Sequence, residues 1–101
     1  MVKHIVLFKL ADEAEGNTKL RNAEIIKERL ENLRNSIPQI RKICVRINSQ
    51  DSPEGNYDLM LDSEFDNMDD AKSYSVHPNH LKVVEFITKV RTSRAAIDYE
   101  F

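Results

Sequence analysis

The stretch that decides the fold is Val2-Lys-His-Ile-Val-Leu-Phe-Lys-Leu10, near the start of the chain. Alternate residues of this stretch form two sets, and both sets contain apolar side chains, which is typical of a β-strand covered on both faces. Such a strand belongs in the middle of a sheet. One set consists of Val2, His4, Val6, Phe8 and Leu10, and the other of Lys3, Ile5, Leu7 and Lys9.

The rest of the chain predicts a β-α-β-β-α-β order. Apolar residues recur every three or four positions in the helical segments and every second position in the strands. Pro38 ends the first helix, because proline lacks the N–H that a helix interior needs. Pro78 interrupts the second helical region, since proline is favoured in the first turn of a new helix. The expected strands cover residues 2–10, 43–47, 57–65 and 95–101, and the expected helices cover about 18–36, 67–75 and 78–90.

The connections and helix ends carry finer signals. Residues 11–16 are expected to form an acidic, polar connection, and residues 48–56 form a long loop rich in Asn, Ser, Asp, Pro and Gly. Leu20 is assigned to the apolar stripe of the first helix. Asn17 or Thr18 is expected to cap the N-terminus of that helix. Either Asp66 or Asn67 is expected to cap the second helical region, because a short polar side chain there accepts a free backbone N–H.

This order of elements is that of the ferredoxin-like α+β fold. Right-handed crossovers place the strand 2–10 between the strands 57–65 and 95–101, with both helices on one face of the sheet. The opposite face is then bare. Lysines and acids pair across it around an apolar centre of Ile5, Leu7 and Met60. The residues assigned to this open face are Lys3, Ile5, Leu7, Lys9, Asp58, Met60, Asp62 and Glu64.

The bare face predicts a homodimer. A monomer would expose the apolar centre of this face to water. Soluble proteins rarely expose large apolar patches in this way. A second copy related by two-fold symmetry covers the centre with a single self-complementary surface. We therefore expect a homodimer formed through the open sheet face. The alternative is a solvated face with scattered apolar residues.

Composition narrows the class of protein further. The chain has 101 residues, which fits one domain, 1–101, without a second core. Its formal net charge is −2, and no block of Lys and Arg forms the basic stripe that nucleic acid requires. The longest apolar run, Ile5 to Phe8, is far shorter than the roughly 20 residues that span a bilayer, so no membrane role is expected. The single Cys44 excludes an internal disulfide and favours the reducing cytoplasm.

Three polar residues are candidates for a functional site. His4 shares its strand face with Val6 and Phe8 and is expected to point toward the helices, while His80 is expected to point back at the sheet. Tyr74 lies just before the break at Pro78 and overhangs the same space. Imidazole titrates near neutral pH, and a tyrosine hydroxyl can donate to a developing enolate oxygen. The three residues thus predict a small-molecule pocket with proton-transfer chemistry, or else hydrogen-bonded core residues without a catalytic role.

No metal or cofactor is expected. His77 and His80 are three residues apart and could form a metal site with His4, but no Cys or carboxylate motif accompanies them. Pro78 also disturbs the helical spacing of a ligand pair, and His77 is expected to be a capping or turn residue. The sequence contains no P-loop, no GxGxxG and no GxSxG, so nucleotide-dependent and hydrolase chemistry has no support.

Three segments together resemble the stress-responsive A/B barrel (Dabb) family. They are Met1-Val-Lys-His-Ile-Val-Leu-Phe-Lys9, Tyr74-Ser-Val-His-Pro-Asn-His80 and Ile97-Asp-Tyr-Glu-Phe101, and the resemblance covers nearly the whole chain. It implies a ferredoxin-like protomer whose sheet meets the sheet of a second copy, which makes a dimeric α+β barrel. Members of the family include plant stress proteins, bacterial proteins of unknown role and a plant polyketide cyclase.

The resemblance also implies roles for the candidate residues. In the cyclase, a Tyr and a His of the corresponding segment act in an aldol condensation, assisted by a pocket His on the first strand. The matching positions here are Tyr74, His80 and His4, with His80 as general base at a carbon next to a carbonyl, Tyr74 holding the oxygen, and His4 orienting ligand or water. A further pocket His of the cyclase corresponds to Leu59, which argues against the cyclase's own substrate.

The resulting hypothesis is a dimeric protein that binds or transforms a small carbonyl or aromatic molecule by cyclase-like proton transfer. Two alternatives stay open at this point. One is a non-catalytic stress-responsive or assembly protein, in which the same residues pack the interior. The other is a cofactor-free, monooxygenase-like oxidation, as other dimeric α+β barrel families perform.

Overall fold

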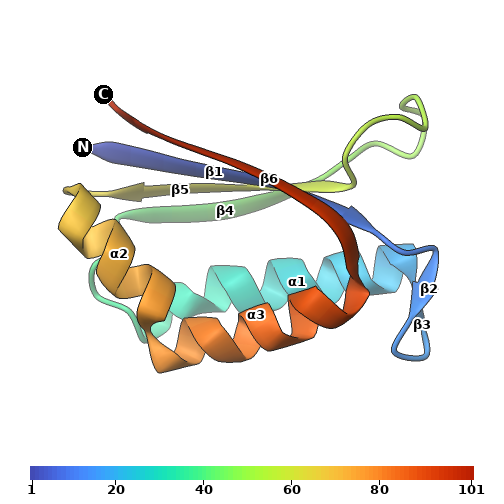
Figure 1. Cartoon of the computed structure of the whole chain (residues 1–101), viewed down its shortest axis with the longest axis horizontal. Coiled ribbons are helices and arrows are strands. Elements are labelled where there is room, and N and C mark those ends of the chain that lie inside the picture. The colour runs from blue at the N-terminus through green and yellow to red at the C-terminus, as the bar shows by residue number, and fades with distance from the viewer.

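The computed structural model describes all residues, 1–101, as a four-stranded antiparallel sheet with helices packed on one face (Figure 1). The strand order is β4-β5-β1-β6. β1 (Val2–Leu10) lies between β5 (Leu59–Phe65) and β6 (Arg91–Glu100), and β4 (Lys42–Ile47) forms one edge. The predicted element order, the central position of the first strand and the ferredoxin-like α+β fold are confirmed.

Side-chain caps and prolines define the helix ends. The Asn67 side chain accepts a hydrogen bond from the Asp70 N–H at 2.8 Å. His77 has the predicted capping role, because its Nδ1 accepts from the Asn79 N–H at 3.1 Å where the last helix begins. The helices are α1 (Lys19–Asn32, followed by a 3₁₀ turn at Leu33–Asn35), α2 (Met68–Val76) and α3 (Pro78–Val90). None of them is long and apolar enough to cross a lipid bilayer.

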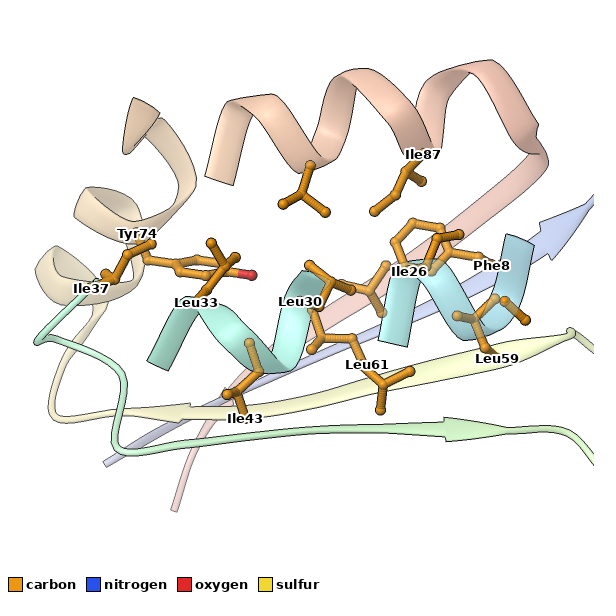
Figure 2. Packing of buried hydrophobic residues seen from close by; sticks show 14 of the residues in the cluster. Phe8, Ile26, Leu30, Leu33, Ile37, Ile43, Leu59, Leu61, Tyr74 and Ile87 are labelled. Atoms are coloured by element: carbon orange, nitrogen blue, oxygen red, sulfur yellow. The ribbon is translucent and has the colours of Figure 1, made fainter. Parts of the chain in front are cut away.

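The hydrophobic core lies between the helices and the sheet. It is a cluster of 18 buried residues to which β1 contributes Val6, Phe8 and Leu10. Val6 stands opposite Leu61 in the β1–β5 register, so one apolar surface runs across the two central strands. Figure 2 shows how Leu30 of α1 and Ile87 of α3 converge on this surface. The core therefore fixes the helices over β4, β5 and β1 and leaves β6 less covered.

The outer edge of β4 is covered by side chains of α1. The Lys27 ammonium donates to the Val45 carbonyl at 2.7 Å, and the Glu31 carboxylate accepts from the Val45 N–H at 2.9 Å. Arg34 donates to the Ile43 carbonyl at 3.3 Å. Unpaired edge groups are a template for pairing with another strand, and here both backbone groups of Val45 and the Ile43 carbonyl already have partners. Strand addition at this edge is therefore obstructed.

The open face has the expected arrangement of charges around apolar residues. The Lys3 ammonium lies 2.9 Å from the Asp62 carboxylate and 2.6 Å from that of Glu64. Leu7 stands opposite Met60 in the register. The prediction for Asp58 is wrong, because its carboxylate turns away from this face to accept from the Leu10 N–H at 2.8 Å, and it also lies 3.6 Å from the Lys19 ammonium.

The segment before α1 has more structure than the sequence indicated, and one prediction there is wrong. A hairpin of β2 (Glu13–Ala14) and β3 (Asn17–Thr18) occupies most of the polar connection and the two residues after it, with φ of 52° at Glu15 and 76° at Gly16, as a two-residue type I′ turn requires. Leu20 is 43% exposed rather than part of the core. The inward position is taken by Asn22, which is fully buried and donates to the Ala14 carbonyl at 3.0 Å, so it ties the hairpin to the helix.

Two strands begin more than one residue away from the expected start. β5 begins at Leu59, so Tyr57 belongs to the preceding loop. β6 begins at Arg91, four residues before the predicted start, because β1 continues to pair with it as far as the partners Leu10 and Arg91. Residues 91–94 lie at the uncovered edge of the sheet, so they lack the apolar alternation that reveals a strand in sequence.

Candidate functional site

A cavity of about 460 Å³ lies between the sheet and the helices. His4 of β1, Tyr74 of α2 and His80 of α3 all line it. The structure therefore brings together the three residues that the sequence singled out. The volume lies in the range of small-molecule sites, which is roughly 300–1,000 Å³. Apolar side chains make up more than half of the lining, among them Phe8, Leu61 and Ile87.

Tyr74 has the most unusual environment in the cavity. Its side chain is 1% exposed, and no protein group hydrogen-bonds to its hydroxyl. A buried polar group without a partner costs about 1–3 kcal/mol. Burial raises the pKa of the Tyr74 phenol above its ordinary value, so the hydroxyl keeps its proton and is a donor. Figure 2 shows this hydroxyl directed from α2 into the interior of the protein.

His80 is held next to Tyr74 as a neutral base. Their ring centroids are 4.3 Å apart. The Nδ1 atom of His80 lies 3.0 Å from the Ser75 carbonyl, which only accepts, so Nδ1 carries the proton and Nε2 is left with a free lone pair. Burial lowers the pKa of His80, and this effect outweighs the hydrogen bond to Ser75. The imidazole is therefore uncharged at neutral pH and can accept a proton.

His4 is oriented by Asp98, a residue that the sequence analysis missed. The His4 Nδ1 atom and the Asp98 carboxylate form a hydrogen bond, and the two residues are direct partners in the β1–β6 register. A carboxylate at Nδ1 fixes the tautomer and leaves Nε2 to accept. The ring centroid of His4 lies 6.3 Å from that of Tyr74, so the two imidazoles flank the phenol. The alternation of residues in the last strand indicates that Asp98 and Ile97 lie on opposite faces of the sheet. No sequence pattern gives the register of that strand against β1, so the pairing of Asp98 with His4 could not be predicted.

Three basic residues at the cavity were also missed. Lys72 of α2 and Arg91 and Arg94 of β6 line it, and none of them forms a salt bridge within the chain. Isolated basic residues are common on protein surfaces, so the sequence offered no signal for them. The early start of β6 is what places Arg91 and Arg94 beside the site.

The other residues considered from sequence lie outside this arrangement. His77 does not line the cavity, and its Nδ1 is engaged in the cap of α3. No three His, Cys, Asp or Glu side chains converge as metal ligands would. Cys44 is a half-buried residue of β4 and pairs with Asp62 in the register, so it belongs to the open face of the sheet.

The strand order and the one-sided helix layer define a ferredoxin-like α+β protein with a pocket between its layers. Residues 2–101 match the family model described as the Stress Responsive A/B Barrel Domain, or Dabb. The chain therefore belongs to the Dabb family, as the sequence resemblance predicted. Comparison with curated proteins gives no match.

Solved structures from several organisms share the fold. A dimeric protein of unknown function and ferredoxin-like fold from Bacteroides fragilis is 44% identical, with a TM-score of 0.88 over 99% of this chain and 95% of that one. A Dabb family protein from Mesorhizobium loti is 20% identical, with a TM-score of 0.74 over 98% and 94%. The hydroxynitrile lyase from Passiflora edulis is 15% identical, with a TM-score of 0.76 over 97% and 90%. The last two likenesses show a common fold alone.

Proposed function

We propose that the protein binds a small carbonyl or aromatic molecule in the cavity and transfers a proton at the carbon next to the carbonyl. The observation that carries this proposal is the buried, unpartnered Tyr74 hydroxyl beside the neutral imidazole of His80. A ligand carbonyl supplies the missing acceptor for the hydroxyl. The same ligand then presents its adjacent carbon to a base.

Each residue has a defined part in this reaction. Nε2 of His80 removes the proton from the α-carbon, and the electron pair of that C–H bond moves to form an enolate. The Tyr74 hydroxyl donates to the enolate oxygen as negative charge develops there. His4, fixed by Asp98, orients the ligand or a water molecule with its free Nε2. The enolate either recovers the proton from His80 or attacks a second carbonyl carbon to form a C–C bond, as in an aldol addition, and the resulting alkoxide then takes the proton from His80.

The general base and the donor to the enolate oxygen are expected to make rate contributions of similar size. A positioned general base typically contributes about 10²–10⁴ in rate. Removal of one hydrogen-bond donor from an oxyanion typically costs about 10²–10³. Substitution of either His80 or Tyr74 should therefore reduce turnover by about 10²-fold or more.

The proposal includes a homodimer through the open sheet face. Ile97 is 60% exposed, Tyr99 47% and Phe101 59%, and Ile97 stands opposite Ile5 on that face. The β4 edge is obstructed by α1, so a second copy is better accommodated on the face than at this edge. The 44% identical protein from Bacteroides fragilis is described as dimeric. Two sheets meeting in this way give the dimeric α+β barrel, with one cavity in each protomer.

The test uses acetophenone, a small aromatic ketone with exchangeable methyl protons. We expect the wild-type protein in D₂O to speed the loss of the methyl signal in ¹H NMR spectra above the buffer rate. The variants His80→Ala and Tyr74→Phe should abolish or strongly reduce this exchange. The matched control is His77→Asn, which removes a histidine outside the cavity and keeps a capping side chain.

A stability measurement separates catalysis from packing. Because Tyr74→Phe removes only an unpartnered hydroxyl, its midpoint of thermal unfolding should equal or exceed that of the wild type. If acetophenone neither binds nor exchanges in the wild type, and Tyr74→Phe lowers the unfolding midpoint, the residues serve the core and the protein belongs to the non-catalytic class.

A further inference from the structure

The charge of the cavity is opposite to that of the chain. The chain has a formal net charge of −2, yet the charged lining consists of Lys72, Arg91, Arg94 and Asp98. Asp98 is already engaged by His4. Six of the other twelve Lys and Arg residues lie within 4 Å of a carboxylate, among them Lys3, Lys27 and Arg41. Three cations without a partner at one cavity favour an anionic ligand group there.

We propose that the ligand of this cavity carries a carboxylate, so that it is a small carbonyl or aromatic acid. This inference rests on the proposed function and adds the substrate class. The planar guanidinium of Arg94 or Arg91 presents two parallel N–H donors, which match the two oxygens of a carboxylate. The ammonium of Lys72 adds a third positive charge from α2, on the helical side of the cavity.

The position of Arg94 relates the anion site to the reacting groups. Arg94 precedes Asp98 by four residues on β6, and an even spacing places both side chains on the same face of the strand. Its partner in the register is Phe8, and the partner of Asp98 is His4, so the two lie along one side of β1. The positive charge of Arg94 also contributes to the lowered pKa of His80. Guanidinium and base therefore belong to one local electrostatic environment.

The rest of the lining is consistent with an acid of modest size. Apolar side chains such as Val6, Phe8 and Ile87 can surround a ring or an alkyl part. A carboxylate held by Arg94 leaves the ketone carbonyl of the same molecule free to reach Tyr74. The cations also reduce the cost of a second negative charge on the enolate.

The experiment compares two ligands that differ in one group. Benzoylformate has a ring, a ketone and a carboxylate, and 1-phenylpropane-1,2-dione replaces the carboxylate by an uncharged acetyl group. Both are titrated into ¹⁵N-labelled wild type, Arg94→Gln and Lys82→Gln, with the dissociation constants taken from amide chemical shifts. Lys82 is an exposed cation of α3 that does not line the cavity, so its variant is the matched control for charge. Phenyl phosphate is a further ligand, which distinguishes a carboxylate from a phosphate source.

We expect benzoylformate to bind about tenfold or more tightly than the dione in wild type and in Lys82→Gln. Arg94→Gln should reduce this preference and the dependence of benzoylformate binding on NaCl, whereas Lys82→Gln should change neither. If the dione binds at the cavity and benzoylformate binds no better, the carboxylate inference is wrong, whereas binding of a carbonyl ligand, the first part of the proposed function, is supported. Tighter binding of phenyl phosphate than of benzoylformate would also overturn the carboxylate assignment. If neither carbonyl ligand binds, the proposed function fails together with the inference.

Discussion

Tyr74 and His80 are polar side chains in a part of the core where apolar groups would give more stability. Tyr74 is almost completely buried with an unpartnered hydroxyl, and His80 is half-buried beside it. Such an arrangement lowers the stability of the folded state, and a loss of stability of this kind is expected at functional sites. Substitutions of Tyr74 and His80 therefore test the proposed chemistry most directly.

The first prediction at this scale concerns the pKa of His80. Burial lowers it, and the charges of His4, Arg94 and His77 add to that effect against the Ser75 hydrogen bond. We expect the ring protons of His80 in ¹H NMR spectra to titrate below the ordinary value of about 6.5. In Arg94→Gln the pKa should rise, because one repelling positive charge is removed. A pKa of His80 above 6.5 in the wild type would contradict the buried, neutral base.

The lowered pKa of His80 determines how both proton exchange and stability depend on pH. Since Nε2 must be unprotonated to act as base, proton exchange should persist below pH 6.5 and fall only when His80 becomes charged. The contribution of His80 to stability is complete above pH 6.5, where the residue is neutral in both states. It is lost as the pH falls from there toward the folded-state pKa, because unfolded chains take up the proton first.

Sequence could identify three of the site residues because each occupies a position with a clear face. His4 alternates with apolar strand residues, and His80 shares a helical arc with Val83 and Ile87. Asp98 and Arg94 could not be found in the same way. Their contribution depends on the register between the first and last strands, which are separated by almost the whole chain and whose pairing is fixed by tertiary contacts.

Side chains of α1 form hydrogen bonds with backbone groups at the outer edge of β4, so this sheet edge is partly covered. Glu31 accepts from the Val45 N–H and lies 2.9 Å from Lys27, which in turn donates to the Val45 carbonyl. Burial alone would raise the pKa of Glu31, but the Val45 N–H, Lys27 and Arg34 outweigh it and hold the pKa below its ordinary value. The charged form therefore stabilises the fold.

We predict that Glu31→Gln lowers the free energy of unfolding by about 1–3 kcal/mol at pH 7, since a charge-assisted bond to a backbone N–H is lost. Because the folded-state pKa of Glu31 is lowered, its contribution is present above the ordinary value of 4.5 and is lost as the pH falls through the folded-state pKa. Urea denaturation at pH 7 and at pH 3 measures both effects. The exposed Glu28 on the same helix provides the control Glu28→Gln, and equal stabilities of the two variants at pH 7 would refute this role of Glu31.

The long periodic elements could be predicted from sequence, and the short β2–β3 hairpin could not. Its strands have two residues each, so no alternation is detectable. Only the Glu15-Gly16 pair, with both residues at positive φ, forms the turn, and glutamate is not a typical residue there. The burial of Asn22 follows from this hairpin, which is why Leu20 was assigned to the core in its place.

The two faces of β1 belong to different parts of the molecule, the cavity and the open face of the sheet. Its helix-facing side places His4 in the cavity, and its other side places Ile5 and Leu7 at the centre of the open face. The last strand extends this open face with Ile97 and Tyr99, and Phe101 follows it, with its ring centre 5.6 Å from the Lys3 ammonium. In the proposed homodimer a second copy of the chain covers this face.

Sedimentation equilibrium tests this homodimer most directly. At micromolar concentration the wild type should have twice the mass of one chain. Ile97→Asp should have the mass of one chain with an unchanged circular dichroism spectrum, because a carboxylate on each protomer would be buried at the interface. Val76→Asp, a change at an exposed apolar residue of α2 away from this face, should remain dimeric. A wild type with the mass of a single chain would mean that the open face stays in water, and the two-sided role assigned to β1 would be wrong.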